Sequence, residues 1–376
     1  MFGELSPEEF LERHWQRSPV LFRGALPGFR SPIDPDELAG LACEQEVESR
    51  LVQGHIGSRF SLEHGPFEET RFTELPPRDW TLLVQDVDKH VPDVGALLEP
   101  FRFIPDWRID DIMVSFAAPG GSVGPHTDQY DVFLLQAQGR RRWQLSERFD
   151  PRLRDDCDLK VLEHFQPEQQ FVVEPGDLLY LPPNVAHFGL ALDEAVTLSI
   201  GFRAPDQREL CLALGDAVSE RANPNARFSD PGRKRPARPA QIESADLARL
   251  RQLIRDAAVL DDLALDRVIA GYLTRPKPHL EEHGPDTTEK QLLRRLNAGA
   301  RLTRRPGSRW AYLKHGEAWA LYADGEEYPL TSADLDWVER VCRGSDIGSE
   351  VLAADPGTAA RLAKLIARAS LDWVED

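Results

Sequence analysis

Cysteine is scarce in this sequence, which has four among 376 residues. Cys43, Cys157, Cys211 and Cys342 stand far apart, and no two of them form the Cys-x-x-Cys spacing of a zinc or redox site. We therefore expect neither a disulfide framework nor a cysteine-based metal site.

Long apolar runs are also missing. No stretch approaches the roughly 20 apolar residues that a membrane helix needs. The first residues, MFGELSPEEF, are acidic and open a helix, which is not the pattern of a signal peptide. With 41% hydrophobic and 29% charged residues, the sequence predicts a globular cytoplasmic protein of two or three domains, with no membrane partner.

Basic residues are outnumbered, because 45 Lys and Arg face 63 Asp and Glu and give a formal net charge of -18. This balance argues against a general nucleic-acid binder, since phosphate contacts need a basic surface. It suits a basic protein or peptide as partner, because opposite charges speed encounter. An acidic surface that serves solubility alone is the alternative.

Local patterns divide the chain into three parts, 1–205, 206–275 and 276–376. In the first part, Ser6-Pro7-Glu8-Glu9 is a capping box that opens a helix, and Asp34-Pro35 starts a second one. From 112 to 200, short β segments broken by Gly and Pro predict an antiparallel barrel or sandwich. The remaining expected elements of this part are strands at 20–22, 47–52, 59–62 and 80–84 and a helix at 94–101.

The second part contains helical patterns at 207–222 and 244–260, joined by a proline- and arginine-rich connector. Leu247, Leu250, Leu253, Ile254 and Ala257 form one apolar stripe, which is typical of an oligomerising helix, although it could also pack within the chain. A homodimer is therefore one interpretation of this segment.

The third part shows a helix at 288–296, a hairpin at 310–322 and helices at 332–342 and 358–370, an order similar to that of a winged-helix module. Residues 276–376 hold 14 Lys and Arg and 17 Asp and Glu, a net of 14 - 17 = -3. Because a winged helix that binds duplex DNA is normally basic, no direct duplex contact is expected. A cluster of basic residues between 290 and 309 leaves contact with RNA or an acidic surface open.

Three side chains carry the candidate chemistry. His126 and Asp128 form a His-x-Asp pair after a Gly/Pro-rich approach, and His187 follows 61 positions after His126. Two imidazoles and one carboxylate make the facial triad that holds non-haem Fe(II) with open positions. A lone His-x-Asp pair is weak evidence for a metal site, since most such pairs lie on protein surfaces without a function.

Arg141 strengthens the pattern, because it stands 15 residues after His126 on a strand that follows a turn. Arginine is permanently charged and holds a carboxylate through two parallel bonds, as the distal carboxylate of a keto-diacid requires. By strand alternation Arg141 and Trp143 face one way and Arg142 the other. Arg140 and Arg142 are expected outside, paired with acidic residues. Ser115, on a neighbouring strand, is a candidate second donor or simple strand filler.

Residues beside the metal pair are candidates for the mouth of the site. Gln129, Tyr130 and Asp131 follow Asp128 directly and could receive a cationic substrate side chain. This hypothesis predicts that Asp131→Ala changes the KM for the substrate.

The motifs resemble a known family. PGDLLYLPPNVAH is similar to the second motif of cupin barrels, and VSFAAPGGSVGPHTDQYDVFLLQAQGRRRW resembles the JmjC-type cupin oxygenases. The likeness is greatest to the bacterial ribosomal oxygenases, which hydroxylate an arginine of ribosomal protein sixteen of the large subunit. FLERHWQRSPVLFRGAL and VESRLVQ extend it, so that it covers residues 1–205.

The resemblance implies a mixed α+β fold, namely a double-stranded β-helix (cupin/JmjC) barrel followed by a helical dimerisation segment and a winged-helix-like C-terminal domain. It implies Fe(II) on His126, Asp128 and His187, 2-oxoglutarate on Arg141, and O2 as co-reactant. The implied reaction is 3-hydroxylation of an arginine in a basic ribosomal protein, with succinate and CO2 as products. The alternatives are an N-methyl-lysine demethylase, a histidine hydroxylase of another ribosomal protein, and a non-catalytic cupin binding protein.

Overall fold

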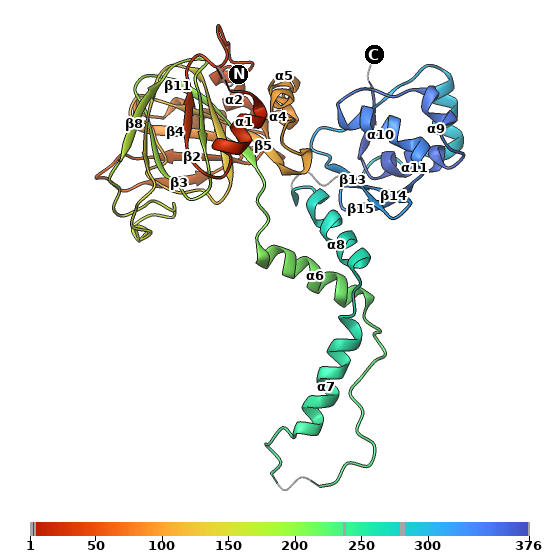
Figure 1. Ribbon diagram of the computed structural model, residues 1–376. Coiled ribbons are helices and arrows are strands. Elements are labelled where there is room, and N and C mark those ends of the chain that lie inside the picture. The colour runs from red at the N-terminus through yellow and green to blue at the C-terminus, as the bar shows by residue number, and fades with distance from the viewer. Residues whose placement is uncertain (1–2, 4, 236–237, 279–282, 375–376) are drawn as a thin grey trace. The chain divides into compact units, whose positions relative to one another are not determined.

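The computed structural model describes residues 3, 5–235, 238–278 and 283–374 (Figure 1). The chain forms two compact units, unit 1 with residues 1–204 and 277–281, and unit 2 with 205–276 and 282–376. The predicted helical part and all of the predicted C-terminal part except 277–281 fall within unit 2, which also includes residue 205 of the predicted first part, and the boundary drawn between the helical and C-terminal parts stays a prediction. Within the described ranges, no helix combines the length and apolarity that crossing a bilayer requires.

Two antiparallel sheets build unit 1, which confirms the predicted β architecture. In the described part of the chain, the larger sheet has eight strands in the order β1-β9-β6-β11-β5-β4-β2-β3, and the smaller has the order β10-β7-β8. The strands are β1 (Val20–Phe22), β2 (Ser49–Gln53), β3 (Ser61–His64), β4 (Trp80–Val84), β5 (Ile109–Ala117), β6 (Asp131–Gln138), β7 (Arg141–Ser146), β8 (Gln169–Val173), β9 (Leu178–Leu181), β10 (Ala186–Ala191) and β11 (Ala195–Phe202).

Strand alternation separates the two faces of the larger sheet. On β5, Ile112 and Val114 are fully buried in the main hydrophobic core, together with Phe10 of the first helix. Met113 and Ser115 point the other way and line a pocket. One face of the sheet therefore packs against the helices, and the other face lines the pocket. The helices of unit 1 are α1 (Pro7–Arg13), α2 (Pro35–Leu41), α3 (Glu69–Thr73), α4 (Val87–His90) and α5 (Pro92–Gly95), with 3₁₀ turns η1 (Ala96–Phe101) and η2 (Asp106–Arg108).

The local sequence signals account for most helix starts. The Ser6 hydroxyl accepts from the Glu9 N–H, and the Glu9 carboxylate accepts from the Ser6 N–H, so the predicted capping box is confirmed. Asp34 and Glu37 form the same arrangement at α2. The helix predicted at 94–101 is mostly a 3₁₀ turn, because Pro100 lacks the N–H that an α-helix would use.

Unit 2 begins with α6 (Gln207–Arg221), α7 (Ser244–Ala257) and α8 (Asp262–Thr274). The sequence patterns predicted the first two, and α8 was missed. None of the residues of α7 is buried, and Leu250 and Ile254 of its apolar stripe are 41% and 68% exposed. The stripe is thus not covered by the rest of the described chain.

The C-terminal half of unit 2 has the predicted helix–hairpin–helix order around the buried Trp337. A third strand joins the hairpin, and a two-stranded ladder was also missed, since its strands are three residues long and far apart. The elements are α9 (Glu289–Asn297), β12 (Leu302–Arg304), β13 (Trp310–His315), β14 (Ala318–Ala323), β15 (Glu326–Leu330), η4 (Ser332–Asp334), α10 (Leu335–Cys342), η5 (Ser349–Ala353), α11 (Thr358–Ala367) and β16 (Leu371–Trp373).

Candidate metal centre

His126 reaches the open face of the sheet through the glycine-rich turn after β5. Gly124 has a φ of +81°, and a side chain there would lie 3.0 Å from both methyl groups of Val161, so this position favours glycine. His126 then forms an isolated antiparallel bridge with His187 of β10. Each residue donates its N–H to the carbonyl of the other, at 3.0 and 2.9 Å. Backbone pairing therefore fixes the two histidines side by side.

Asp128 completes a cluster of three metal-ligating groups. Its carboxylate oxygen lies 3.6 Å from Nε2 of His187 and 4.0 Å from Nε2 of His126. One potential ligand atom from each of the three side chains lies within 4.8 Å of the others. The structure thus brings together the three residues that the spacing singled out, although His126 and His187 are 61 positions apart.

Hydrogen bonds to the backbone orient both imidazoles. Nδ1 of His126 lies 2.9 Å from the carbonyl oxygen of Gly124, and Nδ1 of His187 lies 3.0 Å from that of Val185. A carbonyl oxygen can only accept, so each ring carries its proton on Nδ1 and keeps a lone pair on Nε2. Such outer contacts are typical of histidines that bind metals.

The charge state of His187 also fits a ligand. Burial lowers the pKa of His187 to about 4, and the charge of His126 acts in the same direction, while Asp128 opposes it. His187 is therefore a neutral donor at neutral pH. Metal ligation requires that form, since a protonated imidazole has no free lone pair.

Arg141 lies in the same pocket, which has a volume of about 540 Å³. The residue is 6% exposed, and its Nε and Nη2 have no hydrogen-bond partner among the described residues. Burial lowers the pKa of Arg141 to about 10, so the guanidinium is still charged at neutral pH. A buried, charged and unpartnered group carries a large desolvation cost, which a bound anion would offset.

Neighbouring strands place further polar groups in this pocket. Ser115 of β5 lines it, and its hydroxyl lies 3.5 Å from the Thr197 carbonyl, at the limit of a hydrogen bond. Thr81 of β4 also lines it, with a buried hydroxyl that has no described partner. Thr81 was not predicted as a residue of this pocket. Its strand was predicted, but nothing in the sequence indicated that β4 borders the site.

The predicted alternation along β7 is confirmed. Arg141 and Trp143 both line the pocket, and the Arg141 guanidinium lies 5.7 Å from the Trp143 ring. Arg140 lies outside and pairs with Asp193 at 2.9 Å, as expected. Arg142 does not line the pocket, but it is half-buried and its Nε has no partner among the described residues, so the structure does not bear out its expected ion pair. Trp143 packs on Gly189 of the adjacent strand, where a side chain would lie 2.7 Å from the indole.

Carboxylates form another wall of the pocket. Asp110 and Asp111, at the start of β5, line it together with Tyr130 and Lys277. The Lys277 ammonium lies 3.4 Å from Asp111, 3.6 Å from Asp110 and 3.0 Å from Asp86. Extending the alternation of Met113 and Ser115 by one step would have found Asp111. Lys277 comes from a distant segment and gave no sequence signal.

The hypothesis that Asp131 receives a substrate was wrong. Asp131 is fully buried, and its carboxylate accepts from Tyr180 at 2.6 Å, from Gln16 at 2.9 Å and from Arg108 at 3.1 Å. It is a structural ion-pair partner on the helix-covered side of the sheet. Of the three predicted residues, Tyr130 is the one that lines the pocket.

Comparisons with known proteins match both units. The family model described as JmjC domain matches residues 96–210, and the one described as ROXA-like winged helix matches residues 249–372. The ribosomal protein uL16 3-hydroxylase of Escherichia coli (strain K12) is 45% identical over 249 residues. That alignment spans 65% of this chain and 65% of the relative, slightly less than two thirds of its length.

Solved structures match nearly the whole chain. The X-ray structure of ycfD from E. coli is 36% identical, with a TM-score of 0.82 and coverage of 99% of both chains. A structure described as YcfD, a ribosomal oxygenase from E. coli in complex with cobalt and 2-oxoglutarate, is 35% identical, with a TM-score of 0.78 and the same coverage.

Proposed function

Because this chain belongs to the JmjC-domain ribosomal oxygenase family, we propose that it is an Fe(II)- and 2-oxoglutarate-dependent dioxygenase. Its proposed reaction is hydroxylation of the 3-position of an arginine side chain in the large-subunit ribosomal protein uL16. The observation that carries the proposal is Arg141. Two nitrogens of its buried guanidinium have no partner in the described chain, and it lies in the pocket that holds His126, Asp128 and His187.

We assign the iron to His126, Asp128 and His187. Two neutral imidazoles and one carboxylate suit Fe(II) and leave positions open for further ligands. When bound, the metal supplies the oxidising chemistry with dioxygen and 2-oxoglutarate, which ends as succinate and CO2 while one oxygen atom enters the substrate. The protein holds the ligands in place through the backbone bonds at each Nδ1.

We assign the distal carboxylate of 2-oxoglutarate to Arg141. A guanidinium can bind a carboxylate through two parallel hydrogen bonds, and both unpartnered nitrogens of Arg141 are donors. Ser115 is the second candidate donor, and the unpartnered hydroxyl of Thr81 adds a third. Apolar side chains of the same pocket, such as Val132 and Leu134, keep water away from this pair.

We assign the substrate guanidinium to the acidic wall. Asp110 is partly exposed and the buried Asp111 lies beside it, both within 3.6 Å of Lys277, so an arginine side chain would share two carboxylates with that lysine. Bidentate pairing suits a guanidinium better than a methylated ammonium. This difference favours hydroxylation of arginine over demethylation of lysine.

Mass spectrometry tests the proposed function. Purified enzyme with Fe(II), 2-oxoglutarate and uL16 should form succinate and add one oxygen atom to one arginine. Formaldehyde release from a methylated lysine would favour the demethylase instead, and oxygen added to histidine would favour the histidine hydroxylase. No succinate above the substrate-free background would contradict the enzyme assignment. A ribosomal-protein substrate would place the reaction in the cytoplasm.

We further propose that the chain forms a homodimer through α7. Leu250 and Ile254 lie in a helix with no buried residue, and Leu247 is 36% exposed. A continuous apolar stripe of this kind normally marks a surface that another protein covers. A second copy of the same helix would cover it through a symmetric contact.

Light scattering after size-exclusion chromatography tests the dimer. The double variant Leu250→Glu/Ile254→Glu should elute as a monomer, because it places charge at the centre of the stripe. Arg251→Glu/Arg255→Glu changes two exposed positions of the same helix that lie outside the stripe, and it should remain a dimer. A wild-type monomer would contradict the proposal.

A further inference from the structure

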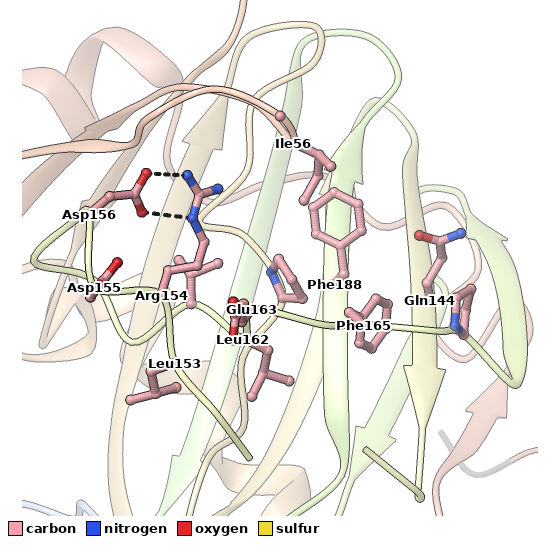
Figure 2. Close-up of a pocket in the computed structure, with 14 residues that line it drawn as sticks. Ile56, Gln144, Leu153, Arg154, Asp155, Asp156, Leu162, Glu163, Phe165 and Phe188 are labelled. Carbon is pink, nitrogen blue, oxygen red and sulfur yellow. Dashed lines mark hydrogen bonds and ion pairs between the residues drawn. The ribbon is translucent and has the colours of Figure 1, made fainter. Parts of the chain in front are cut away.

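A second pocket, with a volume of about 720 Å³, lies in unit 1 beside the metal pocket (Figure 2). The two pockets share the segment 153–163, between β7 and β8, as a wall. Asp158, Leu159 and Lys160 line the metal pocket, whereas 153–156 and 161–163 line the second pocket. Lys160 and Val161 are neighbours in sequence, so one thickness of polypeptide separates the pockets.

The segments that carry the metal ligands also border the second pocket. Pro125 precedes His126 and lines it, and Phe188 follows His187 and lines it. Successive residues of a strand point to opposite faces, so β10 presents His187 to the metal and Phe188 to the second pocket. The pocket is therefore built on the same framework as the metal centre.

Backbone hydrogen bonds hold the shared wall in place. The N–H of Arg154 donates to the Val161 carbonyl at 2.8 Å, and the N–H of Glu163 donates to Arg152 at 2.9 Å. The N–H of Leu162 donates to the carbonyl of Pro125 at 2.8 Å, which ties the wall to the metal-ligating segment. A pre-formed pocket lowers the ordering cost of binding.

The second pocket has an apolar floor and apolar rim. Phe165 and Phe188 lie together in Figure 2, with ring centroids 6.3 Å apart. Ile56 and Leu153 are 54% and 49% exposed, although both are large apolar side chains. Such residues gathered in one hollow are typical of a binding surface.

The charge of the pocket is negative. One arginine, Arg154, lines it together with three carboxylates, those of Asp155, Asp156 and Glu163. Figure 2 shows Arg154 joined to Asp156 by two bonds, of 2.6 and 2.8 Å, so its charge is already compensated. Asp155 and Glu163 are exposed and leave a net negative field for a ligand.

We propose that this pocket docks a basic segment of the protein substrate that flanks the hydroxylated arginine. This inference rests on the proposed function. Acidic groups over an apolar floor match a segment in which Lys or Arg alternates with aliphatic residues. The enzyme would thus recognise substrate residues that flank the hydroxylated arginine, as well as the arginine itself.

Kinetics with two substrates tests the docking site. Asp155→Lys/Glu163→Lys should raise the KM for full-length uL16 about tenfold at low salt, since each rim charge contributes modestly. The kcat should change little, and a peptide limited to the arginine and one neighbour on each side should be unaffected. Glu44→Lys/Glu46→Lys makes the same charge change at exposed positions outside both pockets, and it should behave as wild type.

A second variant separates the apolar contribution from the charge. Ile56→Ser/Leu153→Ser should raise the KM for full-length uL16 severalfold at every salt concentration, whereas the effect of the charge reversal should fade as salt rises. Equal KM changes for full-length protein and short peptide, or none, would overturn the docking site while wild-type turnover upholds the proposed function. If the wild type hydroxylates neither substrate, both proposals fail.

Discussion

Two arginines, the buried Arg141 and the half-buried Arg361, show how differently the metal pocket and unit 2 use charge. Arg361 of α11 reaches Asp334 at 2.7 Å and Asp355 at 2.7 Å. Burial alone would lower the pKa of Arg361, but these carboxylates raise it. Arg141 of β7 has no carboxylate partner among the described residues, and burial lowers its pKa to about 10. The Nη2 of Arg361 is thus bound by two carboxylates, although its Nε has no partner in the described chain, whereas both Nε and Nη2 of Arg141 are available to an anion.

The difference teaches how to separate structural from functional charge. A buried ion pair whose partners are all supplied by the chain holds the fold, and removing one partner leaves an uncompensated charge. A buried charge that lines a pocket and has no carboxylate partner among the described residues is instead suited to binding an anionic ligand. Asp131 belongs to the first kind, which is why its place in the sequence next to the metal pair was misleading.

Removing a metal ligand should give the largest loss of activity with little loss of stability. Asp128→Ala should lower turnover by at least about 100-fold, a loss that even outer partners of metal ligands can cause. Thermal unfolding should change little, because Asp128 is partly exposed and the backbone bridge between His126 and His187 stays. Turnover above one tenth of wild type would contradict the ligand assignment.

Exchanging the two arginines for methionine should sharpen the comparison. Arg361→Met should lower the free energy of unfolding by about 3 kcal/mol or more, since it removes the cationic partner of the buried Asp334 carboxylate. Arg141→Met should not lower it, because no described partner of Arg141 loses a bond. Urea denaturation measures both, and equal destabilisation by the two variants would contradict the distinction.

The acidic wall predicts a smaller, pH-dependent effect. Burial raises the pKa of Asp111 to about 6, although Lys277 and Lys89 lower it and Asp86 and Asp110 raise it further. A cationic substrate prefers the ionised carboxylate, so the KM for uL16 should rise about tenfold from pH 7 to pH 5. In Asp111→Asn that rise should disappear. An unchanged pH profile in this variant would remove Asp111 from the substrate site.

The sequence was informative wherever local rules decide the structure. A capping box predicted α1, Asp34-Pro35 predicted the start of α2, and alternation predicted that Arg141 and Trp143 share a face. His126, Asp128 and His187 were found through residue type and spacing. The positions of Thr81 and Lys277 in the pocket could not be predicted. Thr81 lies there because of the order of strands in the sheet, and Lys277 lies there because a distant segment returns to unit 1. The three-residue strands β12 and β16 were missed because, unlike the equally short but wholly apolar β1, each mixes apolar and polar residues.

Calorimetric titration tests the central claim, that Arg141 holds the distal carboxylate of 2-oxoglutarate. Wild type and Arg141→Met, each loaded with a redox-inert divalent metal, are titrated with 2-oxoglutarate and with 2-oxobutyrate, which lacks that carboxylate. We predict that Arg141→Met weakens 2-oxoglutarate about 100-fold and leaves 2-oxobutyrate nearly unchanged, as expected for a buried charge pair. Equal weakening of both ligands, or of neither, would contradict the claim.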